Sequence, residues 1–406
     1  MTQNIETDIV LVGAGLVGLS AAIAFAQQGK SVCLVDAKKP AIKLKKAWDE
    51  RVYALTPATE AWLKMIGVWA HVDVSRVNPI NTMHIFDDAN MLDKSEAQPL
   101  VLRDEDANLP KLGVIIENQN LMHALWQQLK ALEAKNAAVT VITDAPCQSL
   151  EHTQQNTVLG LDNGQQIAAK LVIAADGVDS WVRKQANIGV TKKYFHQTAI
   201  VANFKVEKHH QNVARQWFAP HDVLALLPLP DKIVSIVWSV STERAVELLA
   251  LSAAELAHNV REYSGGVLGG LTQIGSTRSF VLNQQTASKL IAERVVLMGD
   301  AAHQIHPMAG QGVNLGFRDV MQLASLTTKY CVNKHRAMQD VGDVMFLRQY
   351  ERARKVDIVT MTQLTSGLDA LFASDNSWLK QARQWGLRQL NAKTAIKKLL
   401  IQQVAA

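Results

Sequence analysis

The segment from Ile9 to Val35 places the strongest constraint on the fold. Ile9 to Val12 is an apolar, β-branched run that predicts a strand, and a cluster of glycines follows it. Leu16 to Gln28 is rich in alanine and predicts a helix, which Gly29 ends. Ser31 to Val35 then predicts a buried strand. This order is a βαβ unit, from which α/β folds with a parallel sheet are built.

The glycines between the first strand and the helix have the pattern Gly13-x-Gly15-x-x-Gly18. In this setting Gly13 permits the tight turn, Gly15 lets the backbone approach a pyrophosphate, and Gly18 lets the helix pack closely on the strand. Asp36 ends the second strand, where its carboxylate can accept a hydrogen bond from a ribose hydroxyl. A glycine turn that binds nothing is the alternative, but the strand, helix and acid together favour a dinucleotide site.

Two later segments place acidic residues directly after buried strands. Lys170 to Ala175 predicts such a strand, and Asp176 follows it at an edge where it can reach a ligand. An ordinary Asp-Gly turn is the alternative. Asp300 follows the strand predicted at 294–298 and is positioned to hold the polyol chain of a riboflavin. Gly310 and Gly312 then open a helix whose N–H groups can face the negative charge of a reduced flavin, with Val313 and Asn314 in its first turn.

Composition excludes several other classes of protein. Hydrophobic residues make up 48% and charged residues 19% of the 406 residues, as expected for a globular enzyme with two domains. The three cysteines are far apart, which argues against structural zinc or disulfides and for a reducing compartment. His303 and His306 alone do not predict a metal site. The uncharged run from Ile9 to Ala26 reaches the length of a membrane span, but its glycines favour the βαβ unit.

The positive charge is concentrated near the end of the chain. Residues 376–406 contain six lysines and arginines and no acid, so the remaining residues sum to 5 − 6 = −1. A nucleic-acid footprint, with basic and aromatic residues across a folded face, is missing. The tail also contains Trp378, Trp385 and several leucines, so it can form an amphipathic helix on an anionic membrane or a lipid-binding partner. A basic helix packed on the body of the enzyme is the alternative.

The middle of the chain predicts a second domain. Ala199 to Val206 and Ile233 to Val240 are extended runs without a βαβ rhythm, which favours an inserted antiparallel sheet. We expect a discontinuous cofactor domain, a substrate domain with a β-sheet, and a C-terminal basic helical segment. Their expected ranges are 1–76, 98–182 and 278–370 for the first, 77–97 and 183–277 for the second, and 371–406 for the third.

Three motifs, in their order along the chain, resemble those of the p-hydroxybenzoate-hydroxylase-type flavoprotein monooxygenases. They are the glycines at 13–18, the segment around Asp176, and residues 299–314. Among these monooxygenases, the chain is most similar to the ubiquinone-biosynthesis hydroxylases of the UbiH, UbiF and UbiI type. This likeness rests on residues 299–319 and is supported by Asp49-x-Arg51-x-x-Ala54-Leu55, Ile116-Glu117-Asn118, Gln216-x-Phe218 and Leu226-Leu227-Pro228-Leu229. The resemblance implies a Rossmann-like FAD domain with a β-sheet substrate domain. It also implies roles around FAD for Gly13, Gly15, Gly18, Asp36, Arg51, Asp176, Asp300, Gly312, Val313 and Asn314.

The resemblance further implies a reaction in which a flavin hydroperoxide, formed from molecular oxygen, hydroxylates the ring of a polyprenylated phenol. Arg51 would lie near the flavin and Pro307 would border its ring, while no catalytic base is assigned. NAD(P)H or another donor would reduce the flavin, since the sequence has no second dinucleotide motif. Such an enzyme is expected in the cytoplasm, with possible peripheral contact at the inner membrane or with a ubiquinone-biosynthesis complex. The alternatives are a hydroxylase of a small soluble aromatic and a lipid carrier that has lost its cofactor.

Overall fold

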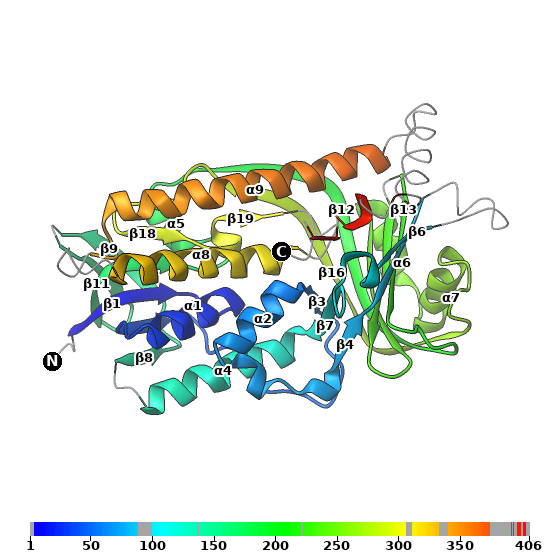
Figure 1. Cartoon of the computed structure of the whole chain (residues 1–406), viewed down its shortest axis with the longest axis horizontal. Coiled ribbons are helices and arrows are strands. Elements are labelled where there is room, and N and C mark those ends of the chain that lie inside the picture. The colour runs from blue at the N-terminus through cyan, green and yellow to red at the C-terminus, as the bar shows by residue number, and fades with distance from the viewer. Residues whose placement is uncertain are drawn as a thin grey trace.

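The computed structural model describes residues 4–402 except 88–98, 136–137, 154, 221, 306–310, 333–339, 374–390, 392, 394–395 and 399–400. The described residues form two halves joined by long strands, with the N-terminal sheet and most helices in one half and a second large sheet in the other (Figure 1). This arrangement places the glycine motif in the first half.

The first half is built on a mainly parallel sheet with the strand order β17-β18-β11-β1-β2-β8. The hairpin strands β9 and β10 extend it from β11. The parallel strands are buried and rich in valine, leucine and isoleucine, as expected when both faces of a sheet are covered. The strands are β1 (Asn4–Val12), β2 (Val32–Val35), β8 (Val139–Ile142), β9 (Cys147–His152), β10 (Thr157–Leu161), β11 (Gln166–Ala174), β17 (Ile291–Ala292) and β18 (Val295–Leu297).

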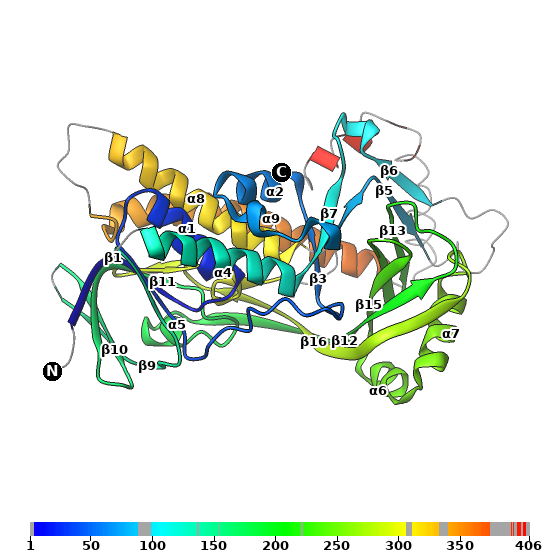
Figure 2. The same cartoon turned by 90° about the horizontal axis from the view of Figure 1, so that it is seen from below.

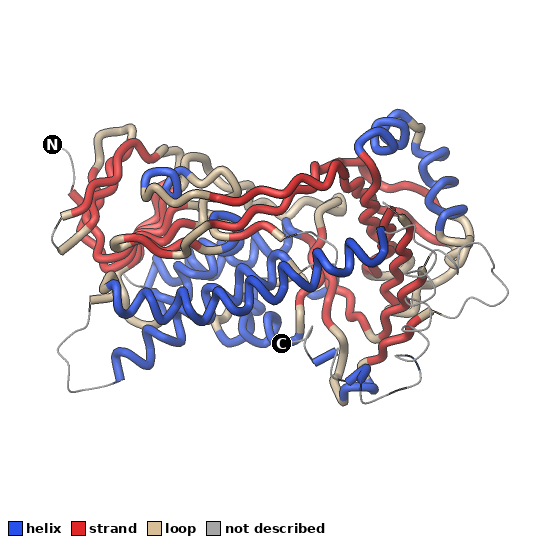
Figure 3. Tube along the Cα trace, turned by 90° about the horizontal axis from the view of Figure 1, so that it is seen from above, coloured by secondary structure: helices blue, strands red, loops and turns tan. Residues whose placement is uncertain are grey.

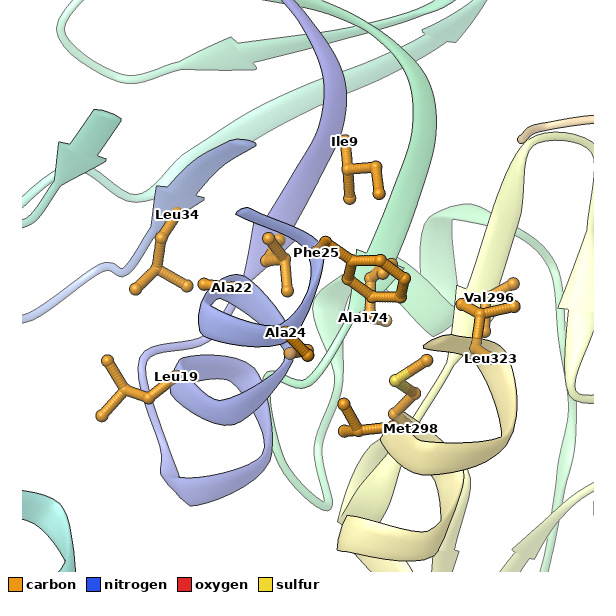
Figure 4. Close-up of a cluster of buried hydrophobic side chains, with 14 of the residues drawn as sticks. Ile9, Leu19, Ala22, Ala24, Phe25, Leu34, Ala174, Val296, Met298 and Leu323 are labelled. Carbon is orange, nitrogen blue, oxygen red and sulfur yellow. The ribbon is translucent and has the colours of Figure 1, made fainter. Parts of the chain in front are cut away.

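Helices cover this sheet and close its core. Helix α1 packs between the sheet, α4 and α8, and its alanines allow close contact. Figure 4 shows side chains of β1, α1, β18 and α8, among them Ile9, Phe25, Val296 and Leu323, packed in one cluster. Burial of each large apolar side chain contributes about 1.5–3 kcal/mol. The helices of this half are α1 (Leu16–Gln27), α2 (Pro57–Met65), α4 (Asn118–Lys135), α5 (Trp181–Gln185), α8 (Gly312–Val332) and α9 (Val344–Ala373).

The second half is an eight-stranded sheet with the order β19-β16-β12-β15-β14-β13-β5-β6. Strands β12 and β16 have 17 residues each and pair along their length, so they run from the first half into the second (Figures 2 and 3). Helices α6 (Thr242–Ala250) and α7 (Ala253–Tyr263) cover one face of this sheet. Its strands are β5 (Thr82–Phe86), β6 (Leu100–Arg103), β12 (Val190–Val206), β13 (Val213–Ala219), β14 (Asp222–Leu229), β15 (Ile233–Ser241), β16 (Leu271–Ala287) and β19 (His303–Gln304).

A small third sheet lies against the other face of the second sheet. Its antiparallel strands are β3 (Val52–Leu55), β7 (Gly113–Glu117) and β4 (Val77–Ile80), with β7 in the centre. Trp48, Val52 and Ile115 pack with Ala214 and Leu229 of the second sheet. The third sheet therefore joins the two halves next to the loop that carries Arg51.

The structure corrects three details of the sequence-based expectations. The pattern of residues 51–67 predicts a helix that is entered through Thr56-Pro57. Residues 52–55 instead form β3, because they pair with β7; α2 begins only at Pro57, with Thr56 as its cap. The Asn163-Gly164 turn predicts a hairpin between strands at 158–162 and 166–169, separate from the buried strand at 170–175. The latter two are in fact one continuous strand, β11. The second sheet also includes β6, which pairs with β5 although it follows the expected boundary at 97, whereas β4 belongs to the third sheet.

The uncharged run from Ile9 to Ala26 is divided between β1, the glycine turn and α1. Across the described part of the chain, every helix is too short or too polar to cross a bilayer.

Candidate functional site

The parallel strands of the first sheet end at one edge. Val12 of β1 lies opposite Val35 of β2 and Ala174 of β11, and Ala174 in turn lies opposite Leu297 of β18. The residues that follow these four positions are therefore brought together at the carboxyl edge, where α/β sheets bind ligands. They include Gly13, Asp36, Asp176 and Asp300, which are separated by up to 287 positions in the sequence.

The three glycines of the first motif meet three different requirements. Gly13 has a φ of +106°, and a Cβ there would lie 2.3 Å from the carbonyl oxygen of Ala175. A Cβ on Gly18 would lie 1.8 Å from the carbonyl oxygen of Gly13. Gly15 is exposed, precedes the first residue of α1, and has open space where a Cβ would stand. Gly13 and Gly18 are thus needed for the fold, whereas the space at Gly15 suits a phosphate approaching the helix N-terminus.

The Asp36 carboxylate is hydrogen-bonded to the glycine loop. Its Oδ2 accepts a hydrogen bond from the Ala14 N–H at 2.6 Å, and its Oδ1 accepts one from the Lys38 N–H at 2.8 Å. Each carboxylate oxygen can accept a second hydrogen bond, so this contact leaves capacity for a ribose hydroxyl. Asp36 therefore combines a structural contact with its expected role in binding.

Asp176 is held by the turn that leads into α5. Its Oδ2 accepts a hydrogen bond from the Val182 N–H at 3.1 Å, while Oδ1 is buried without a hydrogen-bond partner among the described residues. Burial raises the pKa of this carboxyl group, although hydrogen bonds from Ser180 and from backbone N–H groups oppose the shift. A buried oxygen without a partner is costly unless a ligand supplies a donor. Asp176 thus fits the expected contact with a ligand hydroxyl.

Arg183 connects the second motif to the third. Its guanidinium is buried and donates to the carbonyl oxygens of Val178 and Ala301, both at 2.8 Å. Burial lowers the pKa of Arg183.

Asp300 lies in a recessed position on the same edge. Although Asp300 is exposed, loss of hydration raises the pKa of its carboxyl group, and the nearby His303 and Arg51 partly oppose this shift. The preceding Gly299 has a φ of +57°, and a Cβ there would lie 3.0 Å from Val17 in the first turn of α1. Gly316 of α8 approaches Val17 as well. The N-terminal turns of α1 and α8 therefore meet beside Asp300.

Arg51 reaches this region from the loop before β3. Its guanidinium lies 5.4 Å from the ring centroid of Tyr53 and is exposed. Burial raises the pKa of Tyr53 to about 12, and its hydroxyl donates to Asn118 Oδ1 at 3.2 Å. Asp49 fixes the loop because its carboxylate accepts hydrogen bonds from the N–H groups of Arg51 and Gln119, each at 3.0 Å.

A buried ion pair that sequence reasoning did not predict holds the same loop. Arg76 donates to both oxygens of Glu117 at 2.6 and 2.7 Å, and it also bonds the carbonyl oxygens of residues 45–47. Glu117 Oε1 accepts a further hydrogen bond from the Asp49 N–H at 2.6 Å. The Glu117 hydrogen bond is the main cause of the raised pKa of Arg76. The motifs around Asp49 and Glu117, 68 residues apart, thus form one structural unit.

The structure places Asn314 differently from the other predicted residues. Its side chain is fully buried, donates to the Ala54 carbonyl at 2.8 Å and accepts from the Thr56 N–H at 3.1 Å. Asn314 thus ties the start of α8 to the end of β3. Gly312 and Val313 are half-buried at the N-terminus of α8, and the space around Gly312 is open. Pro307 and His306 lie outside the described residues.

This edge of the sheet fits a dinucleotide cofactor that carries phosphates, several hydroxyl groups and a ring that can become anionic. It offers the open glycine at the α1 N-terminus for phosphates, carboxylates at Asp36, Asp176 and Asp300 for hydroxyls, and the α8 N-terminus for an anionic ring. FAD contains all of these groups.

Comparisons with known proteins agree with this assignment. Residues 6–341 match a family model described as FAD binding domain. The chain is 32% identical over 395 residues to the ubiquinone hydroxylase UbiL of Rhodospirillum rubrum, covering 97% of this chain and 88% of that protein. It is also 32% identical over 381 residues to the 3-demethoxyubiquinol 3-hydroxylase of Escherichia coli, covering 94% and 93%.

The fold is shared with more distant enzymes. The structure of the p-nitrophenol 4-monooxygenase PnpA from Pseudomonas putida superposes with a TM-score of 0.77 at 16% identity, covering 100% of this chain and 99% of PnpA. The chain binds FAD, and it has the fold of known monooxygenases. It belongs to the FAD-binding-domain family, among the FAD-dependent hydroxylases that include the ubiquinone-biosynthesis enzymes.

Proposed function

We propose that this FAD-dependent hydroxylase introduces a hydroxyl group into the ring of a polyprenylated phenol or benzoquinol during ubiquinone biosynthesis. The names of its relatives support the pathway, and the chemistry of the second sheet supports the substrate class. When bound, FAD supplies the redox chemistry that activates molecular oxygen. The protein has to bind the flavin, hold the substrate ring beside it and exclude water.

We infer the substrate class from the face of the second sheet that is turned toward the Arg51 loop. Asn203 on β12 identifies this face, because its Nδ2 donates to the Asp49 carbonyl at 3.0 Å. Asn203 lies opposite Ser235 of β15, which lies opposite Leu227 of β14. Residues opposite one another point to the same face, and alternate residues along each strand share it.

No ionisable side chain occupies this face on β13, β14 or β15, all of whose facing positions are described. A substrate with a carboxylate would require a cation here, whereas a neutral ring with an apolar substituent does not. Two cations lie on the same face of the neighbouring strands. Arg278 of β16 is 61% exposed and forms an ion pair with Glu50 at 3.2 Å, and Lys205 of β12, opposite Ile233, is exposed. The facing residues are Ala214, Gln216, Phe218, Val223, Ala225, Leu227, Leu229, Ile233, Ser235, Val237, Ser239 and Ser241.

Turnover with matched substrates tests this proposal. With purified protein, FAD and a reductant, we expect a prenylated phenol to give a product that is one oxygen atom heavier by mass spectrometry. A short aromatic acid should give less than about one hundredth of that rate, since moving an unpaired carboxylate onto an apolar surface costs several kcal/mol. Deleting the gene should cause a prenylated precursor that lacks one ring hydroxyl to accumulate. Turnover of the aromatic acid alone would favour the small-substrate alternative.

We also propose that the C-terminal basic segment provides a peripheral contact with an anionic membrane, from which a prenylated substrate can be drawn. Most of 376–406 lies outside the described residues. In the described part, Asn391 bonds the Pro99 carbonyl and the Val101 N–H beside β6, and Lys397 is buried 4.0 Å from Asp106. This part packs on the body, as in the alternative interpretation, but Lys393 and Lys398 remain exposed.

Flotation with liposomes tests the membrane contact without disturbing the packed part of the segment. Replacing both Lys393 and Lys398 with glutamine should weaken binding to vesicles with anionic lipid by roughly thirtyfold, at about 1 kcal/mol for each basic residue. Replacing Lys192 and Lys193, which are exposed on β12, should leave binding unchanged. Equal flotation of the wild-type protein and the 393/398 variant, or no flotation of either, would contradict the proposal.

A further inference from the structure

A fully buried carboxylate contacts residues on both sides of Asp300. Asp319 lies on α8, and its Oδ2 accepts a hydrogen bond from the Gly299 N–H at 2.8 Å. The same oxygen lies 2.7 Å from Nε2 of His303, which is also buried. Between these two contacts lies the 3-10 turn Gly299–Ala301, with Asp300 at its centre.

The other side of this carboxylate is held from α9. Arg354 Nε donates to Asp319 Oδ1 at 2.7 Å, and its Nη1 pairs with Asp357 at 2.5 Å. Burial alone would raise the pKa of Asp319, but His303, Arg354 and the Gly299 N–H together hold it below its ordinary value. The carboxylate is therefore ionised, and the His303 nitrogen that faces it carries a hydrogen and donates.

We propose that Asp319, together with His303, is the positioning residue that sets the place of the Asp300 carboxylate in the FAD site. The inference rests on the assignment of Asp300 to FAD. One oxygen of Asp319 contacts the turn at its start and just after its end, while Arg354 of α9 holds the other oxygen and so restricts movement of the whole carboxylate. Asp300 lies one residue after Gly299 and three before His303, so little freedom remains for its backbone.

The contacts of Arg354 make it possible to distinguish the positioning role of Asp319 from a general contribution to the stability of the fold. Arg354 donates hydrogen bonds to two carboxylates: that of Asp319, which contacts the turn, and that of Asp357, which does not. Asp357 also pairs with Arg318 at 3.1 Å. Asp357 is 27% exposed, and among the described residues its charged partners are Arg318 and Arg354 rather than residues 299–303. A variant at Asp357 therefore disturbs the same charge cluster without releasing the turn, and it serves as a matched control.

A double-mutant cycle on the full chain tests the proposal, with the FAD dissociation constant measured from flavin fluorescence on refilling the FAD-depleted protein. His303→Phe keeps a planar aromatic ring, although a larger one, and removes the N–H; it should weaken FAD binding by about tenfold. Asp300→Ala should weaken it more. If His303 acts through Asp300, the double variant should match Asp300→Ala within about twofold, because the two losses are not independent.

The controls make each outcome decisive. Asp357→Asn should leave the dissociation constant within about twofold of wild type. Asp319→Asn should weaken FAD binding at least as much as His303→Phe, and urea unfolding of each variant shows whether it is folded. Additive losses in the cycle, or an equal loss for Asp357→Asn, would overturn the positioning role while leaving Asp300 as an FAD residue. An unchanged affinity in Asp300→Ala would overturn both. Neither result bears on the substrate, which is absent from the measurement.

Discussion

Replacing Gly18 with alanine is expected to destabilise the protein by at least about 3 kcal/mol and to abolish FAD binding. The added Cβ would stand 1.8 Å from the Gly13 carbonyl oxygen, and a backbone atom cannot move aside as a flexible side chain can. Helix α1 would have to shift away from β1, which would distort the glycine loop, where we expect the phosphates of FAD to bind. Urea unfolding of the FAD-depleted protein and titration with FAD measure the two effects separately.

Gly15→Ala is the matched control within the same loop. No atom lies within 4 Å of its Cβ position, and its φ of −77° suits any residue. The stability of the FAD-depleted protein should fall by no more than about 1 kcal/mol, the cost of a poorer N-cap. FAD affinity should fall by roughly tenfold to a hundredfold, because the methyl group occupies the space that the pyrophosphate needs. Wild-type affinity in this variant would contradict the placement of the phosphates at the α1 N-terminus.

Glu117→Gln is expected to cost about 3–5 kcal/mol of stability, because Arg76 would lose its buried partner. The side chain of Glu117 is fully buried, and the amide of glutamine would direct N–H groups at a guanidinium or at the Asp49 N–H. The loop from Lys45 to Arg51 would lose its anchor, so FAD affinity should fall as well. Denaturant unfolding and FAD titration measure both effects.

A partly exposed ion pair on α4, the helix that follows Glu117, provides the control for this substitution. Lys130 and Glu133 form an ion pair on α4 that solvent reaches from both sides. Glu133→Gln should change stability by no more than about 0.5 kcal/mol. Similar losses for the two glutamine variants would show that the Arg76–Glu117 pair does not anchor the loop.

Local patterns in the sequence predicted much of the first half of the protein. The βαβ unit was readable because a glycine turn between apolar runs has few alternative conformations, and the start of α8 at Gly312 followed from the glycines that precede the helix. The helix expected from Arg51 was wrong at its start, since residues 52–55 pair with β7, which lies about 60 positions further on. Pairing between distant strands leaves no local signature, so sequence alone could not place this strand.

The sequence by itself determined the residue types that an FAD site needs and the conformational roles of Gly13 and Gly18, because special backbone geometry restricts which amino acids can be used. Only the tertiary structure decided how those residues are held. Asp36 bonds the glycine loop, Asn314 ties α8 to β3, and Asp319 contacts both ends of the Asp300 turn. The structure also decided which side chains share the face of the second sheet that is turned toward the Arg51 loop. These relations depend on register and on the packing of segments far apart in the chain, and such contacts are set by the whole fold.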